Sequence, residues 1–382
     1  MKHLHFIFII TICVIGFSCK EKPIEALEVI RTYTAKEVSA RSLIDQVGFV
    51  KLETTADNLI GSVSKILFTD SLIIIVDKDV SRTIQVFDKK GKFLHKIGNF
   101  GKGPTEYGLI CDVTLSYDKS NIHILCYRRL LTYDLNGKFI SSQKTKSTIH
   151  LIEYIDKNKF ATFNYAGLFY TKEGSYLNLL EVVDTDFKNK IYSGVKSSFG
   201  PNDFAMAYQF PLVNVEGKVY ILPDLSDTIY QITDEKVIPR YYIKTERPKP
   251  NSKEIINSAK KGELGMAEKF NGGFYHIGNI VIIPIMSASK PLYFYNTKSK
   301  KTYTYDGYKL KRDHPLLLFS NALKTQYKSS LVTVASPSDI LSYKDQFYKS
   351  YDKKMIDSLL ENMTEDDNPI LLFYHVNQSE PK

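Results

Sequence analysis

The stretch FDKKGKF at Phe87–Phe93 returns 46 residues later as YDLNGKF at Tyr133–Phe139. In both copies an aspartate begins, and a glycine closes, a short link between two apolar runs. Aspartate can accept hydrogen bonds from the turn backbone, and glycine adopts the positive φ that such turns need. A short, β-branched run precedes each copy, Leu72–Val76 in the first and Ile122–Cys126 in the second. These runs are too short for helices, so the pattern predicts two successive units of paired strands.

Weaker copies of the same unit follow along the chain. Strand-like pairs at Leu179–Phe187, Val219–Gln231 and Ile280–Asn296 continue the pattern. A period of about 45–50 residues that holds about four strands is typical of propeller blades. The sequence therefore predicts an all-β fold, a six-bladed β-propeller, with a β-sandwich of similar hairpins as the alternative.

The two ends of the chain are predicted to share the closing blade. Val47–Leu52 and Ile370–Val376 are both strand-like, and a propeller must leave no open sheet edge. Residues 43–382 are therefore predicted to form one propeller domain with short helical insertions. Ser252–Phe270 is a charged segment that predicts a helical or irregular insertion. Ser338–Asn362 carries an apolar stripe at helical spacing after capping residues, which predicts a second, helical one.

The N-terminus is typical of an export signal. Lys2 precedes an apolar run at Phe6–Phe17, which is too short to span a bilayer. Ser18 and Cys19 follow, and this end resembles a bacterial lipoprotein signal. We therefore predict a signal peptide at residues 1–18, lipidation of Cys19, and a location in the cell envelope as an outer-membrane lipoprotein. Residues 19–42 are predicted to form the tether and the start of the mature chain. A plain secretory signal is the alternative.

The composition excludes several classes of protein. With 43% hydrophobic and 24% charged residues, the chain of 382 residues is neither collagenous nor wholly disordered. The 26 Tyr and 22 Phe favour β structure. The net charge of +9 is small for this length, and an exported protein does not normally meet chromosomal DNA, so nucleic acid is excluded as a partner. Only Cys111 and Cys126 lie in the folded part, either bridged or as two buried thiols.

The chain also resembles a known family at three places. These are Leu52-Glu53-Thr54, the stretch GNFGKGPTEY at Gly98–Tyr107, and the strand NPILLFY at Asn368–Tyr374. Together they resemble the six-bladed β-propeller lipoproteins of Gram-negative bacteria, which are distant relatives of NHL-repeat propellers. The resemblance implies a six-bladed propeller outside the cytoplasm and carries no assigned activity.

Motifs for catalysis or for cofactor binding are missing from the sequence. The glycine-rich stretch Gly98–Gly108 lacks the Gly-Lys-Ser/Thr ending of a phosphate loop and precedes a strand. It is predicted to be a crossover between blades, with positive φ at Gly101 and Gly103. Histidines of the mature chain never lie within four residues of each other, and no Gly-x-Ser-x-Gly occurs. We therefore assign no catalytic, cofactor or metal residue.

The predicted function is that of a membrane-anchored module that binds a ligand or a partner protein. Propeller loops gather on one face, and polar residues follow a buried strand or lie in the glycine-rich crossover. The candidate ligand-binding residues are Asp77, Arg82, Lys102, Glu106 and Tyr107. Their chemistry suits an envelope protein, a peptide or a glycan. The alternative is a lyase or hydrolase that acts on glycans or peptides at the mouth of the propeller channel.

Overall fold

The computed structural model describes most of the chain after the N-terminal segment. The described residues are 27–145, 149–164, 180–195, 212–223, 226–246, 261, 273–285, 289–310, 314–317 and 323–381. The predicted signal with Cys19 lies outside them, as does the predicted insertion at 252–270 apart from Lys261.

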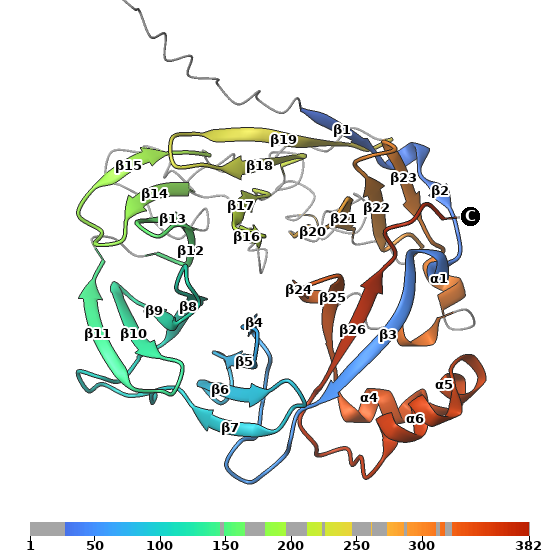
Figure 1. Ribbon diagram of the computed structural model, residues 1–382, viewed down its shortest axis with the longest axis horizontal. Coiled ribbons are helices and arrows are strands. Elements are labelled where there is room, and N and C mark those ends of the chain that lie inside the picture. The colour runs from blue at the N-terminus through green and yellow to red at the C-terminus, as the bar shows by residue number, and fades with distance from the viewer. Residues whose placement is uncertain are drawn as a thin grey trace, which may run out of the picture.

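Six sheets stand around a common axis (Figure 1). The first three blades take their strands in chain order from the inside outward. Blade I is β4 (Lys65–Phe68), β5 (Leu72–Asp77), β6 (Thr83–Asp88) and β7 (Phe93–Lys96); blade II is β8 (Ile110–Leu115), β9 (Asn121–Cys126), β10 (Arg129–Asp134) and β11 (Phe139–Lys144); blade III is β12 (Leu151–Asp156), β13 (Lys159–Phe163), β14 (Leu180–Asp184) and β15 (Lys190–Ser193).

The other three blades each borrow a strand from the N-terminal part of the chain. Blade IV is β16 (Leu212–Val215), β17 (Lys218–Ile221), β18 (Thr228–Ile232), β19 (Val237–Lys244) and β1 (Glu28–Arg31); blade V is β20 (Tyr275–Ile277), β21 (Ile280–Pro284), β22 (Leu292–Asn296), β23 (Lys301–Thr304) and β2 (Lys36–Glu37); blade VI is β24 (Leu323–Tyr327), β25 (Ser330–Ala335), β26 (Ile370–Val376) and β3 (Ile44–Lys51). The six-bladed propeller that the sequence predicts is confirmed.

Blade VI closes the ring with strands from both ends of the chain. Strand β26 pairs antiparallel with β3, from Ile370 opposite Lys51 to Val376 opposite Ile44. This pairing gives the outer edge of the last blade a partner, which confirms the predicted closure. The remaining edge of β3 is the outer edge of the disc.

Part of the stretch predicted as a tether lies in the sheets. Within residues 19–42, β1 pairs parallel with β19 and β2 pairs parallel with β23. The side chain of Ile30 is fully buried in the core between blades IV and V. Because this burial is favourable, the chain runs along the outside of two blades before it enters the third.

The two copies of the sequence repeat form equivalent hairpin turns. Gly91 has φ +87° and Gly137 has φ +88°. Asp88 Oδ1 accepts from two backbone N–H groups of its turn at 2.8 and 3.0 Å. Asp134 Oδ1 does the same at 2.9 and 2.8 Å. The third copy places Phe187 at the glycine position, with φ +55°.

The equivalent turns of blades II, III and IV are also bonded to the blade before them. A side chain from the outer strand of the preceding blade donates a hydrogen bond to a backbone carbonyl of the turn, at the position that follows the aspartate or its equivalent. The contacts are His95 Nε2 to the Leu135 carbonyl (2.8 Å), Gln143 Nε2 to the Thr185 carbonyl (2.8 Å) and Tyr192 Oη to the Thr233 carbonyl (2.7 Å). The repeat therefore includes the joint between blades.

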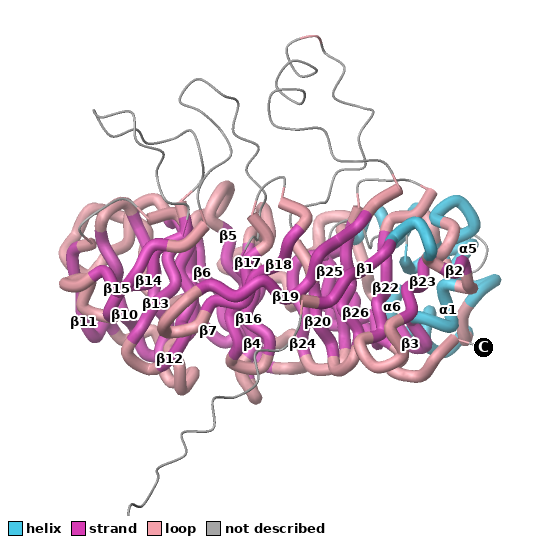
Figure 2. The backbone as a smooth tube through the Cα atoms, turned by 90° about the horizontal axis from the view of Figure 1, so that it is seen from above, coloured by secondary structure: helices cyan, strands magenta, loops and turns pink. Residues whose placement is uncertain are grey.

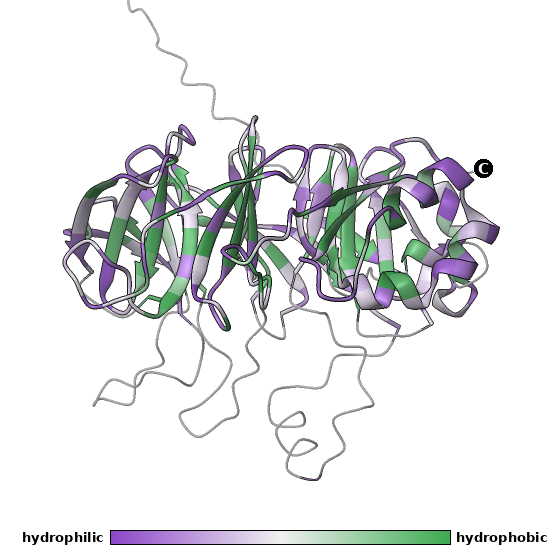
Figure 3. Cartoon of the chain, turned by 90° about the horizontal axis from the view of Figure 1, so that it is seen from below, coloured by the Kyte–Doolittle hydropathy of each residue, from purple (hydrophilic) through white to green (hydrophobic). Residues whose placement is uncertain are grey.

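The strands are mostly hydrophobic and many of the turns are hydrophilic (Figure 3). Buried apolar side chains of neighbouring blades pack against each other, as between blades I and II. The predicted helical segment near the C-terminus forms α4 (Pro337–Ser342), α5 (Lys344–Ser350) and α6 (Lys353–Leu360), outside β3 in Figure 1. A fourth short helix, α1 (Ala40–Leu43), precedes β3. Cys111 and Cys126 are both free thiols, and burial raises the pKa of Cys126 to about 11.

Candidate functional site

In blades I and II, one face of the disc carries the connections that lead into the inner strand and those between the second and third strands (Figure 2). We call this the loop face. Blades I and II contribute residues 52–64, 78–82, 97–109 and 127–128 to it. All five predicted ligand residues lie in these connections or, for Asp77, at the strand end that enters one. Whether they bind a ligand stays a prediction.

The Asp77 carboxylate is hydrogen-bonded to the backbone of the loops around it. Its carboxylate accepts from the N–H groups of Gly61 and Ser62, both at 2.9 Å, and from Val80 and Ser81 at 2.9 and 3.1 Å. Burial opposes ionisation, but these hydrogen bonds lower the pKa of the Asp77 carboxyl below its usual value. Asp77 therefore holds two loops of the face in place.

Arg82 and Tyr107 are joined across the first two blades. The buried Tyr107 hydroxyl donates to the Arg82 carbonyl at 3.2 Å, and burial raises the pKa of this hydroxyl. The exposed Arg82 guanidinium lies 4.8 Å from the centroid of the Phe100 ring. This stacking leaves the edge of the guanidinium available to an anionic group.

Close contact with the Glu106 side chain, and not a positive φ, accounts for the glycines at positions 101 and 103. Its Oε2 accepts from the Gly103 N–H at 2.8 Å. A Cβ at Gly101 would overlap the Glu106 carboxylate. Neither Gly101 nor Gly103 has a positive φ, so that prediction was wrong; the positive φ in this stretch is +60° at Gly98. Lys102 is exposed on the same turn.

Large apolar side chains gather on the same connections. Each is between 44% and 66% exposed, and they are Leu59, Val80, Phe100, Leu109 and Tyr127. Exposed cationic residues adjoin them in the chain: Arg82, Lys102 and Arg128. Exposed apolar side chains mixed with arginine are typical of the centre of protein interfaces.

A second group of polar side chains lines the propeller axis, where the six inner strands meet. A cavity of about 150 Å³ lies there. Its polar lining includes Lys65, Glu153, Asn214, Lys324 and Gln326, from four different blades. The Gln326 amide is bonded to the His276 backbone N–H at 2.8 Å and to its carbonyl at 2.9 Å, so it joins blades V and VI.

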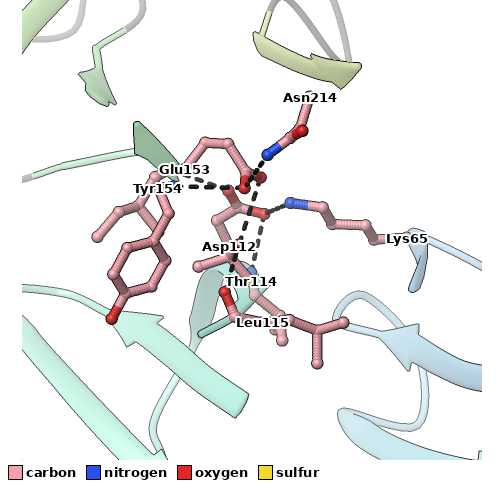
Figure 4. Close-up of polar contacts among 9 residues, drawn as sticks. Lys65, Asp112, Thr114, Leu115, Glu153, Tyr154 and Asn214 are labelled. Atoms are coloured by element: carbon pink, nitrogen blue, oxygen red, sulfur yellow. Dashed lines mark hydrogen bonds and ion pairs between the residues drawn. The ribbon is translucent and has the colours of Figure 1, made fainter. Parts of the chain in front are cut away.

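Lys65 and Asp112 form an ion pair between blades I and II (Figure 4). Lys65 Nζ lies 2.7 Å from Asp112 Oδ1. The nearly buried Asp112 carboxylate also accepts from the backbone N–H groups of Val113 (2.8 Å) and Ile152 (3.0 Å). This pair is therefore neutral as a whole and firmly held.

Glu153 faces the same space from blade III (Figure 4). Its carboxyl accepts from Thr114 Oγ1 at 3.3 Å and from Asn214 Nδ2 at 3.2 Å. Burial raises the pKa of the Glu153 carboxyl, and the nearby Asp112 adds to this, while the Lys65 charge opposes it. Sequence reasoning missed this group because its members come from short strands of four blades that lie far apart in the sequence.

Metal ligands do not converge in the part of the chain that the structure describes, which holds no group of three or more His, Cys, Asp or Glu residues. Within the same residues, no helix is long and apolar enough to cross a bilayer.

Comparison with known proteins places this chain in a family. The model of the family named Domain of unknown function (DUF4934) matches residues 27–375. The chain belongs to the DUF4934 family. No curated protein matches it. The relation to NHL-repeat propellers stays a prediction for this DUF4934 chain.

Two solved structures from Bacteroides resemble this DUF4934 propeller. A Bacteroides fragilis NCTC 9343 protein predicted to be exported has a TM-score of 0.73 at 17% identity, over 92% of this chain and 100% of that one. A member of the DUF4221 family from Bacteroides vulgatus ATCC 8482 has a TM-score of 0.53 at 12% identity, over 88% and 97%. At these identities the likeness shows the shared fold alone.

Proposed function

We propose that this DUF4934 protein is an exported, membrane-anchored binding module that recognises a partner protein through the loop face of blades I and II. The observation that carries the proposal is the set of exposed apolar side chains beside exposed arginine and lysine. Isolated exposed apolar residues are common on proteins, but here five lie on the connections of two adjacent blades.

The cations at residues 78–82, 97–109 and 127–128 favour an acidic partner. Lys78, Arg82, Lys102 and Arg128 lie there against Asp79 and Glu106. Two further exposed carboxylates, Glu53 and Asp57, lie on the connection at 52–64 and balance the charge of the four connections as a whole. Arg82 is held over Phe100, so its guanidinium loses less freedom when it pairs with a carboxylate. The partner segment we propose has leucine or aromatic residues flanked by aspartate or glutamate.

The anchor belongs to the same proposal. The short apolar run before Cys19 supports lipidation there. A lipid at Cys19 holds the propeller in the cell envelope, where the partner is another envelope protein. The sequence favours a protein partner over a glycan, because the chain has no Trp to stack on sugar rings.

The test uses the mature chain and a fluorescent peptide that carries Leu and Phe between Asp and Glu residues. Fluorescence anisotropy should show saturable binding, at least about tenfold tighter than that of the same peptide with Lys in place of the acids, or about 1.4 kcal/mol. The double change Arg82→Ala and Lys102→Ala should remove this preference. The double change Lys157→Ala and Lys236→Ala is the matched control, since both lysines are exposed in turns of the opposite face.

Two outcomes would contradict the proposal. Equal affinity for the acidic and basic peptides would show that the charges of the loop face do not select the partner. Cleavage of the bound peptide would replace the binding role with the enzymatic alternative.

A further inference from the structure

Lys324 is a half-buried ammonium group on the wall of the axial cavity. Among the described residues it has neither a hydrogen-bond nor an ion-pair partner, whereas Lys65 on the neighbouring blade is paired with Asp112. Burial lowers the pKa of the Lys324 ammonium, and the nearby Asp79 carboxylate opposes this. A cation kept in such a place costs free energy unless an anion joins it.

The other charged groups around the cavity form no ion pair with Lys324, although the Asp79 carboxylate lies near enough to act on its pKa. Lys65 and Asp112 neutralise each other at 2.7 Å. Burial raises the pKa of the Glu153 carboxyl, while the Lys65 charge opposes this. The Glu153 oxygens accept from Thr114 and Asn214 and can also accept from a ligand hydroxyl, and the Asn214 amide offers further donor and acceptor groups. The cavity wall therefore presents one ammonium group that forms no ion pair within the described residues, together with polar groups that can form hydrogen bonds.

We propose that the axial cavity is a second binding site, distinct from the loop face, which takes a small organic carboxylate. Lys324 binds the carboxylate, and Glu153 and Asn214 bind a hydroxyl or second polar group of the ligand. The apolar wall, made by Leu67, Leu212 and Phe274, holds its carbon skeleton.

The size of the cavity limits the ligand. About 150 Å³ corresponds to the volume of roughly five water molecules. A hydroxy acid or a short dicarboxylate fits this space, and a peptide or an oligosaccharide does not. The site therefore differs in ligand class from the loop face.

The experiment is calorimetric titration of the mature chain with lactate and succinate, against the uncharged analogues lactamide and succinamide. We expect at least one of the two carboxylates to bind, and its amide to bind at least about tenfold more weakly. Lys324→Met should abolish that binding while the protein stays folded by circular dichroism, because the change removes an unpaired charge. Lys328→Met is the control, since this exposed lysine follows the same strand and does not line the cavity.

The two proposals fail separately. Lys324→Met should leave binding of the acidic peptide unchanged, and the Arg82 and Lys102 changes should leave carboxylate binding unchanged. The inference is overturned if neither carboxylate binds, if the amides bind equally well, or if Lys324→Met binds like the unchanged protein.

Discussion

Lys89 Nζ lies 4.2 Å from the centroid of the Tyr327 ring, and this contact joins the first blade to the last. The same ammonium lies 4.9 Å from the Phe68 ring, which stacks on Tyr327 with 4.3 Å between centroids. Lys89 Nζ is buried, and no hydrogen-bond partner lies within the described residues. Two aromatic faces therefore replace water around a cation at the joint where the ring closes.

Lys89→Met should reveal the value of this contact. Methionine keeps most of the apolar stem and loses the charge, so we expect a loss of about 1–2 kcal/mol in the free energy of unfolding. Denaturant titration measures it. Lys328→Met is the control, because its Nζ lies 5.4 Å from the same ring but on an exposed side chain. An effect of Lys328→Met as large as that of Lys89→Met would contradict the role of desolvation.

Substitutions at Gly91 and Gly217 can distinguish the cost of an unfavourable backbone conformation from the cost of a steric overlap. Both have a positive φ, +87° and +83°. A Cβ at Gly217 would meet no atom within 4 Å, whereas one at Gly91 would overlap the Lys51 carbonyl of the closing blade. Gly217→Ala should cost about 1 kcal/mol and Gly91→Ala about 2–4 kcal/mol in unfolding free energy. Equal losses of unfolding free energy for the two substitutions would show that the contact between Gly91 and the closing blade can shift at little cost.

His123 should make the protein sensitive to acid. Burial lowers the pKa of His123 to about 4, from a usual value of about 6.5. The ring is neutral in the folded protein, so the stability present above pH 6.5 is lost as pH falls towards 4, by about 3 kcal/mol. The free energy of unfolding should depend less steeply on pH over this range for His123→Gln than for the unchanged protein. A slope equal to that of the unchanged protein would rule out this histidine as the cause.

Cys19→Ala tests the anchor independently of the propeller. Without the thiol no lipid can be attached, so the variant should leave the membrane fraction or remain unprocessed. Fractionation and the mass of the mature chain measure this. A variant that stays in the membrane fraction with the mature mass of the unchanged protein would disprove lipidation at Cys19.

Local pattern was sufficient to predict the blades. The hydrogen bonds that form the turns at Asp88 and Asp134 lie within five residues, so the local sequence is sufficient to predict these turns. The closing strand at Ile370–Val376 was also predictable, because a strand-like segment at each end needs a partner. The order of the antiparallel strands in the six sheets follows from these short-range rules and from closure, whereas the parallel pairing of β1 with β19 and of β2 with β23 does not.

The roles of the predicted site residues depended on contacts from elsewhere in the chain. The sequence shows that Asp77 follows a buried strand, but not that two of its partners are the N–H groups of Gly61 and Ser62. It shows Tyr107 as a polar loop residue, but not that its hydroxyl donates to the Arg82 carbonyl. Position along the chain predicts which face a residue reaches, but not what already satisfies its polar atoms.

By itself, the sequence determined the blade repeat, the turn chemistry and the closing strand, since each depends on neighbours in the chain or on one simple pairing. Only the tertiary structure decided the axial cavity. Lys65, Asp112, Glu153 and Lys324 lie in the inner strands of four blades, and their residue types do not repeat from blade to blade. They meet because closing the ring turns one edge of every blade towards a common axis, where the charges of Lys65 and Asp112 act on the pKa of the Glu153 carboxyl.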